Sequence, residues 1–230
     1  FRNNILAVLV TVPGQLVLGL LVAVMIHNLK FGKNVYKSMF YIAVICDWVV
    51  VANIFDYIFQ PDDGSLVNYI LLQLHIIKEP IAWLQETWTG NFVIWVFSIW
   101  KGFGWVMIIY TAALQGTSND LYEAATIDGA TRFQRIIHIN IPAIMPTIII
   151  MLIMRLGQVM SVGYEKIILL YNEGIYETAD VISTYVYRMG LVDRQYSFYA
   201  AVGLFNSVVN FVLVILANHI SKKVSDTSLW

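Results

Sequence analysis

Charged residues are scarce in this sequence. Only 13% of its 230 residues are Asp, Glu, Lys or Arg, whereas soluble domains contain about 25%, and 59% are hydrophobic. The mean hydropathy is +0.69, and the apolar residues fall in long runs. This composition excludes an ordinary soluble surface and indicates a protein whose solvent is lipid. The net charge of -1 excludes a global basic field, so we expect no nucleic-acid partner.

Cysteine and the common catalytic signatures are also nearly absent. The single cysteine, Cys46, lies in an apolar run, which predicts a buried thiol and excludes a disulfide within the chain. The histidines have no metal-ligand spacing, and neither a nucleophile elbow nor a catalytic carboxylate pair is found, so we expect no metal and no catalytic residue. The segment "FGKN" at 31–34 lacks the upstream glycine and the hydroxyl of a phosphate-binding loop. The chain is therefore not expected to hydrolyse ATP.

Long apolar runs are what the sequence does contain. A helix needs roughly 20 residues to cross a bilayer, which predicts a polytopic, all-α membrane bundle formed by residues 1–230 as a single domain. A shorter run, 66–77, is expected to form an interfacial helix. No signal-peptide cleavage site is seen, and the missing initiator Met suggests that a longer N-terminus is absent. The predicted spans are about 5–27, 38–59, 92–114, 141–163 and 196–220.

The charges in the loops predict one orientation. The 28–37 loop carries Lys30, Lys33 and Lys37 and no acid, which places it in the cytoplasm. Alternation then places the net acidic 60–91 loop outside. It also puts the 115–140 loop in the cytoplasm, together with the tail that carries two lysines. We therefore expect the polar insert within 115–140 to be cytoplasmic.

That insert, "LYEAATIDGATRFQRIIHINIPAIMP" at 121–146, has clear local signals. Asp120-x-x-Glu123 resembles a capping box, so a helix is expected from Leu121 to Asp128. Gly129 suits the left-handed position that ends such a helix. Thr131-x-x-Gln134 predicts a second helix, which should end near Pro142 because proline disfavours helix in the residue before it.

Neither short helix would be stable alone in water. The small residues Ala124 and Ala125 share a face with Leu121, and Phe133 projects from the second helix with Arg132 and Arg135 available to the other side. This pattern is typical of a docking element. The alternative is an ordered loop in which Glu123 serves only its own helix cap.

The insert resembles the signature of the permease subunits of binding-protein-dependent ABC importers. Glu-Ala-Ala is followed at fixed spacing by Asp-Gly-Ala, an aromatic residue, Ile and Pro. The resemblance covers most of the chain and implies a type I importer permease in the bacterial plasma (inner) membrane. "YETADVISTYVYRMGL" and "SDTSLW" are similar to the oligosaccharide or polysaccharide branch of the carbohydrate type. The matching positions are Glu123, Ala124, Ala125, Asp128, Gly129, Ala130, Phe133, Ile139 and Pro142.

This resemblance implies a mechanism and partners. The 117–140 segment would be a pair of coupling helices seated on a cytoplasmic ATPase, with Glu123 pairing with a basic residue, Arg132 near the contact and Asp128 bracing the turn. Two ATPase subunits would bind ATP and Mg, which this chain would not. A second homologous permease, giving a heterodimer, and an extracellular solute-binding protein are also implied. The family commonly has a further spanning helix before Ile5, which we expect to be absent here.

Polar residues inside the predicted spans are candidates for the substrate path, because such residues are costly in lipid. Aromatic faces and planar polar groups suit sugar binding. The alternatives are pairing of Asp47 or Asp56 with Lys101 or Arg155, and aromatic residues that serve the membrane interface. Asp56 and Tyr57 could instead face the binding protein. The candidates are Asp47, Asn53, Asp56, Tyr57, Trp100, Lys101, Trp105, Arg155, Gln158, Asn206 and Asn210.

The rival interpretation is an ion-coupled secondary transporter of a polar solute, in which Asp47, Asp56, Lys101 and Arg155 form the coupling site. Such carriers often show internal repeats and helices broken at the membrane midplane. We find no convincing repeat between the two halves of the sequence. A channel is weaker still, because no filter-like segment is present.

Overall fold

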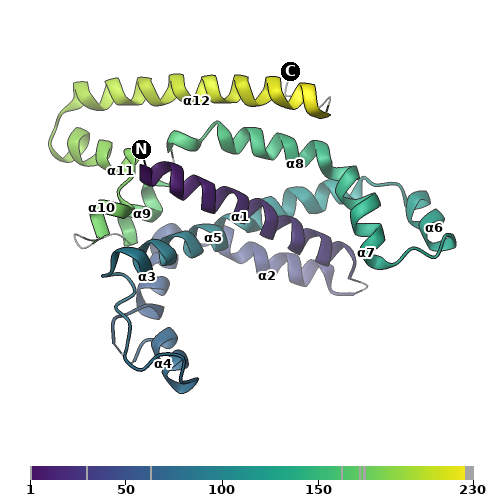
Figure 1. The fold of residues 1–230 in the computed structure, drawn as a ribbon, viewed down its shortest axis with the longest axis horizontal. Coiled ribbons are helices and arrows are strands. Elements are labelled where there is room, and N and C mark those ends of the chain that lie inside the picture. Colours follow the sequence, from purple (N-terminus) through teal and green to yellow (C-terminus); the bar gives the residue numbers. More distant parts are fainter. Residues whose placement is uncertain are drawn as a thin grey trace. The chain divides into compact units, whose positions relative to one another are not determined.

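The computed structural model describes residues 2–29, 31–62, 64–161, 163–170, 172 and 175–225. Every regular element in these ranges is a helix, which confirms the predicted all-α class (Figure 1). Lys30 of the 28–37 loop, Asp63 of the acidic 60–91 loop and the terminal residues 226–230 lie outside the described residues. The elements are α1 (Arg2–His27), α2 (Lys33–Ile45), α3 (Trp48–Ile58), α4 (Leu66–Gln73), α5 (Thr87–Gln115), α6 (Asn119–Ile127), α7 (Arg132–Arg135), η1 (Ile136–Asn140), α8 (Ile141–Leu156), η2 (Val159–Ser161), α9 (Tyr164–Leu170), α10 (Tyr176–Ala179), α11 (Ile182–Tyr187), η4 (Arg188–Val192) and α12 (Tyr196–Ser225).

Four helical stretches in the described ranges are long and apolar enough to cross a membrane, namely Arg2–His27, Thr87–Gln115, Arg132–Leu156 and Tyr196–Lys223. A fifth crossing requires α2 and α3 to act together as one broken span. The predicted span over 38–59 thus corresponds to two helices bent by 95° and not to one continuous helix. The break occurs at Asp47, whose carboxylate Oδ1 accepts a hydrogen bond from the Val49 amide at 2.8 Å and so begins a new helix.

The prediction that the second helix of the insert ends near Pro142 is also wrong. Residues Arg132–Leu156 form one helical stretch, and its middle, η1, is a π-helix in which the Ile141 amide donates to the Ile136 carbonyl. Pro142 lies directly after this wider turn, near the start of α8. A π turn relaxes the regular ladder where proline has no amide to donate, so the helix continues. It ends at Leu156, earlier than the predicted 163.

The chain divides into two compact units. Unit 1 contains Phe1–Thr11, Ile45–Lys101 and Gln158–Asn210, and unit 2 contains Val12–Val44, Gly102–Gly157 and Phe211–Trp230. The three longest helices, α1, α5 and α12, each contribute one part to each unit.

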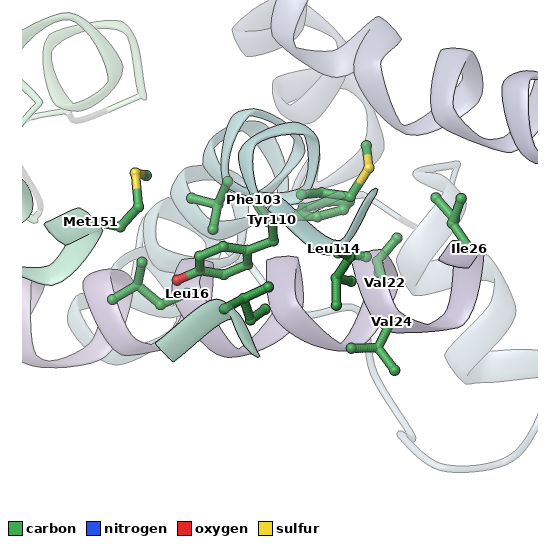
Figure 2. Packing of buried hydrophobic residues seen from close by; sticks show 12 residues of the cluster. Leu16, Val22, Val24, Ile26, Phe103, Tyr110, Leu114 and Met151 are labelled. Carbon is green, nitrogen blue, oxygen red and sulfur yellow. The ribbon is translucent and has the colours of Figure 1, made fainter. Parts of the chain in front are cut away.

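The core of unit 2 is formed by α1, α5 and α8. Tyr110, Leu114 and Ile144 are fully buried in it, and Figure 2 shows Tyr110 and Leu114 among the packed side chains. Gly19 of α1 allows close approach to α5, because a Cβ atom there would lie 2.7 Å from Cγ1 of Val106. Small residues at such crossings let helix backbones pack closely in membranes.

The core of unit 1 brings α3, α5 and α9 together with residues 175–181. Val51, Phe97 and Ile175 are almost fully buried in this cluster. Cys46 packs against it but is only half-buried, which corrects the expectation of a fully buried thiol. In the 60–83 segment of the same unit, the buried Asn68 accepts hydrogen bonds from the Ile81 amide and the Trp83 indole, which fixes the loop around α4.

Candidate functional site

The first helix of the polar insert, α6, begins at a different residue from the one expected. Ser118 is its N-cap, and the Ser118 hydroxyl accepts a hydrogen bond from the Asp120 amide at 3.2 Å. Asp120 lies in the first turn, where its negative charge favours the helix N-terminus. The Asp120–Glu123 capping box is therefore wrong, because the serine two residues earlier takes the cap.

The turn after α6 is the predicted one. Gly129 has a φ of +73°, and the Ala130 amide donates to the Ala125 carbonyl while the Gly129 amide donates to Thr126, the bonding pattern of a Schellman cap. The Thr131 capping box is also confirmed, because the Thr131 amide donates to Oε1 of Gln134 and the Gln134 amide donates to the Thr131 hydroxyl. The helix, left-handed glycine and second helix are therefore encoded locally.

Most of the signature residues are exposed. Glu123, Ala124, Asp128 and Arg132 are exposed, and Phe133 is 70% exposed despite its apolar ring. All five belong to the predicted ATPase-coupling set, and we call these five residues the coupling surface. Of the other predicted members, Gly129 and Pro142 are exposed, and Ala125 and Ala130 are half-buried.

A shallow, open depression lies along α6, and Glu123 and Ile127 line it. Ile127 is 86% exposed. A carboxylate beside an exposed apolar side chain is suited to a protein partner with a basic residue.

Tyr122 attaches α6 to the rest of unit 2. Its hydroxyl donates a hydrogen bond to Oδ1 of Asn140 at 2.8 Å and lies 3.3 Å from Nε2 of His27. Asn140 is fully buried in the π-helical η1, and His27 ends α1. Burial raises the pKa of the Tyr122 phenol, so the hydroxyl stays protonated and able to donate at neutral pH. Tyr122 therefore connects α6 to the end of one candidate span, at His27, and to the interior of another, at Asn140.

Arg135 also stabilises the turn between α6 and α7, by contacts from the second helix. Its Nε donates to the Ala130 carbonyl at 3.2 Å, and one terminal nitrogen lies 3.4 Å from the Thr126 hydroxyl. The sequence assigned Arg135 only to the outer side of the second helix. In the structure it also bonds back to α6 and to the turn, where Asp128 was expected to act as the brace.

The predicted substrate-path residues on α3 have different surroundings. Asp47 is the helix cap described above, and Asn53 donates from its side chain to the Val49 carbonyl at 2.8 Å. Asn53 and Asp56 line one cavity of about 290 Å³ within unit 1, so the structure brings these two together. Tyr57 is 67% exposed and does not line this cavity.

Lys101 is the most buried of the predicted path residues. Its ammonium donates to the Cys46 carbonyl and lies 4.6 Å from the centre of the Trp48 ring. The cation thus holds the break between α2 and α3. Its neighbour Trp100 is partly exposed, and its ring packs 5.8 Å from that of Phe55.

The remaining path residues are divided between the two units. In unit 1, Asn210 accepts a hydrogen bond from the Met160 amide at 3.1 Å, Asn206 lines a second cavity, and Gln158 is exposed. In unit 2, Trp105 is half exposed and Arg155 is partly buried on α8. Within each unit, the predicted substrate-path residues therefore lie in separate groups and do not form one site.

The comparisons with known proteins decide the family. Residues 15–226 match the binding-protein-dependent transport system inner membrane component. The chain belongs to this family. The permease is accordingly a multi-pass protein of the bacterial inner membrane, as the sequence predicted.

Relatives of this permease include sugar transport proteins. It is 37% identical over 92% of its length to Protein LplB of Bacillus subtilis, covering 66% of that protein. It is 32% identical, again over 92%, to the polygalacturonan/rhamnogalacturonan transport system permease protein YteP of the same organism, covering 65%. The chain thus spans slightly less than two thirds of the length of these relatives.

Solved structures of a bacterial alginate importer match the fold of this permease. One is an ABC transporter involved in import of the acidic polysaccharide alginate, with a TM-score of 0.89 and 35% identity over 97% of this chain and 78% of that chain. The other is the alginate ABC transporter in complex with an alginate pentasaccharide-bound periplasmic protein. Its TM-score is 0.91, with 35% identity over 100% of this chain and 79% of that chain. The expected type I importer permease fold is confirmed.

Sequence reasoning missed Tyr122 and the bracing role of Arg135 in this permease. A tyrosine next to Glu123 has no distinguishing local signal, because its partners His27 and Asn140 are far away along the chain. The one available indication was an asparagine inside an otherwise apolar segment, since a buried amide needs a partner.

Proposed function

We propose that this permease is the transmembrane subunit of an ATP-driven importer and forms half of the translocation path for an oligosaccharide. The observation that carries the proposal is the exposed coupling surface, built on a preformed helix–glycine–helix in a chain of membrane helices. Membership of the binding-protein-dependent family supports import. Relatives that transport polygalacturonan, rhamnogalacturonan or arabinooligosaccharides support an oligosaccharide as the substrate.

The coupling surface would seat on a separate cytoplasmic ATPase. Glu123 is exposed, so it can form an intersubunit ion pair, and Ala124 lets the partner approach closely. Tyr122 would pass the movement of α6 into α1 and α8 through His27 and Asn140. ATP and Mg would bind to the two ATPase subunits, and this chain would supply no cofactor site.

Two further partners complete the proposed machine. An extracellular solute-binding protein would deliver the sugar, and the related alginate transporter in complex with a periplasmic protein supports this. A second homologous permease, giving a heterodimer, would form the other half of the path.

The test is reconstitution of the permease with its ATPase subunits and binding protein in liposomes. We expect the permease to co-purify with the ATPase and sugar-loaded binding protein to stimulate ATP hydrolysis. Sugar uptake that needs no ATPase would overturn the proposal in favour of a secondary transporter.

Glu123→Lys places a cation where an ion pair to a basic partner residue is proposed. We expect stimulated ATP hydrolysis to fall by about tenfold or more, since breaking a charge pair at an interface costs about 2–5 kcal/mol. Asp120→Lys is the matched control, because it makes the same change of charge on α6 at another exposed position. Equal losses in both variants, or undiminished coupling in Glu123→Lys, would remove Glu123 from this role.

A further inference from the structure

A cavity of about 380 Å³ lies entirely within unit 1. It is formed by residues of η2, α9, α11, η4 and α12, so its wall draws on segments that are separate in the sequence. Its volume falls in the range of about 300–1,000 Å³ that is usual for small-molecule sites. Among the predicted substrate-path residues it includes Asn206 alone.

Tyrosine rings dominate the cavity wall. Tyr164 and Tyr187 lie with their ring centres 4.9 Å apart at an interplanar angle of 51°, and Tyr199 contributes a third ring. The C–H face of a sugar ring packs well on an aromatic face, and a phenol adds a hydroxyl that can donate or accept. The wall therefore combines flat apolar faces with polar edges.

Asn206 brings an acceptor to this wall. Its Oδ1 is buried and has no hydrogen-bond partner in the described part of the chain. In this orientation the oxygen is covered, and leaving a buried acceptor unpaired costs about 1–3 kcal/mol. A turn of the Asn206 side chain that presents the oxygen to the cavity would let a ligand hydroxyl donate to it and recover that free energy. The nearby Ser161 hydroxyl, 3.4 Å from Nδ2 of Asn210, adds a second polar group.

Charge is absent from the lining residues that the structure describes, which are tyrosine, serine, asparagine, glycine and apolar types. A carboxylate in such a cavity would lose its hydration without gaining a cationic partner. Uncharged hydroxyl groups, in contrast, match the amide and phenols. The chemistry thus favours a neutral sugar ring over a uronate.

From this geometry we propose that the cavity binds one uncharged sugar ring of the transported oligosaccharide, through Tyr164, Tyr187 and Asn206. The proposal rests on the proposed function of oligosaccharide import and assigns that substrate a contact point. With its side chain turned toward the cavity, Asn206 accepts a hydrogen bond from a ring hydroxyl, and the tyrosines cover the ring faces.

Gly203 gives a direct way to close the cavity. It lies in the cavity wall on α12, and a Cβ added there meets no atom within 4 Å. Gly203→Leu therefore fills space that is open in the structure, and leucine is the better helix former. Ala201→Leu is the matched control, because Ala201 is exposed on the same helix and does not line the cavity.

The experiment measures binding of fluorescent sugars to the complete permease–ATPase assembly in nanodiscs, without the binding protein. The neutral probes are maltohexaose and arabinohexaose, and the acidic probe is hexagalacturonate. We expect the wild-type assembly to bind a neutral probe, Gly203→Leu to weaken it by about tenfold or more, and Ala201→Leu to leave it unchanged. Asn206→Leu should weaken it by about two- to tenfold, as loss of one hydrogen bond predicts.

Three results would overturn this assignment. One is neutral-sugar binding that Gly203→Leu leaves intact, and another is sensitivity to Gly203→Leu for hexagalacturonate alone. The third is a Gly203→Leu assembly that loses binding of spin-labelled stearate but keeps binding of every sugar. This result would assign the cavity to lipid. ATP-dependent uptake by the wild-type assembly is measured in parallel. Its absence would count against the proposed function, whereas uptake unaffected by Gly203→Leu would count against the cavity alone.

Discussion

Two regions of unit 2 achieve order in opposite ways. The α6–turn–α7 segment has no buried residue in either helix and is held by caps, a left-handed glycine and the hydrogen bonds of Tyr122 and Arg135. The α1–α5–α8 core has no comparable set of local signals and is held by close packing around Tyr110 and Leu114 (Figure 2). A region ordered by local hydrogen bonds keeps its side chains exposed for a partner, whereas a region ordered by packing has already buried its apolar side chains against each other.

The largest effect is expected from breaking the packed region. Gly19→Leu would force a side chain into the space 2.7 Å from Val106, and overpacking of this kind costs about 1–3 kcal/mol or more. We expect a lower unfolding temperature and less folded protein in detergent. Gly203→Ala is the control, because its new Cβ meets nothing and alanine favours helix. Equal stability of the two variants would show that the α1–α5 contact is loose.

A smaller effect is expected from cutting the attachment between the two regions. Tyr122→Phe keeps the ring but leaves Oδ1 of the fully buried Asn140 without its donor, at a cost of about 1–3 kcal/mol. We expect faster amide hydrogen exchange in α6, unchanged exchange in α5 and several-fold weaker coupling of ATP hydrolysis to uptake. Tyr69→Phe, at an exposed tyrosine of α4, should change none of these. Normal coupling with fast exchange in α6 would separate the attachment from transport.

The smallest effect is expected within the local turn itself. Gly129→Val must hold a β-branched residue at a φ of +73°, which costs about 1–2 kcal/mol, whereas asparagine adopts this conformation readily. We expect loss of exchange protection at the end of α6 in the valine variant and little change in Gly129→Asn. Since a Cβ at Gly129 meets no atom within 4 Å, similar behaviour of both variants would show that backbone strain is not the cause.

The same contrast explains how much could be predicted from the sequence. Gly129 and the Thr131–Gln134 box were predictable because each depends on residues within one turn. The start of α6 was assigned to Asp120 because both aspartate and serine cap helices, and only the backbone geometry selects Ser118. Local sequence signals thus predict that a helix is present better than they predict the residue at which it begins.

Other contacts in the structure are not revealed by residue type alone. Asp47 is a predicted substrate-path residue because acids in spans are costly, and the structure adds that its carboxylate begins α3 at a break in the helix. The Tyr164–Tyr187 pair and its proximity to Asn206 depend on three segments meeting, which no local pattern encodes. The fold class was predictable because composition and apolar run length suffice for it.

The π turn of η1 fixes how side chains before and after it are oriented around the same helix. Because α7, η1 and α8 are one helical stretch, Arg132 and Phe133 of the coupling surface and the faces of α8 lie on the same helix. A π turn contains one residue more than an α turn, and each residue advances an α-helix by about 100°. The extra residue therefore changes the direction in which Phe133 points around the helix axis relative to the faces of α8. A deletion within η1 would turn Phe133 to another side of the helix.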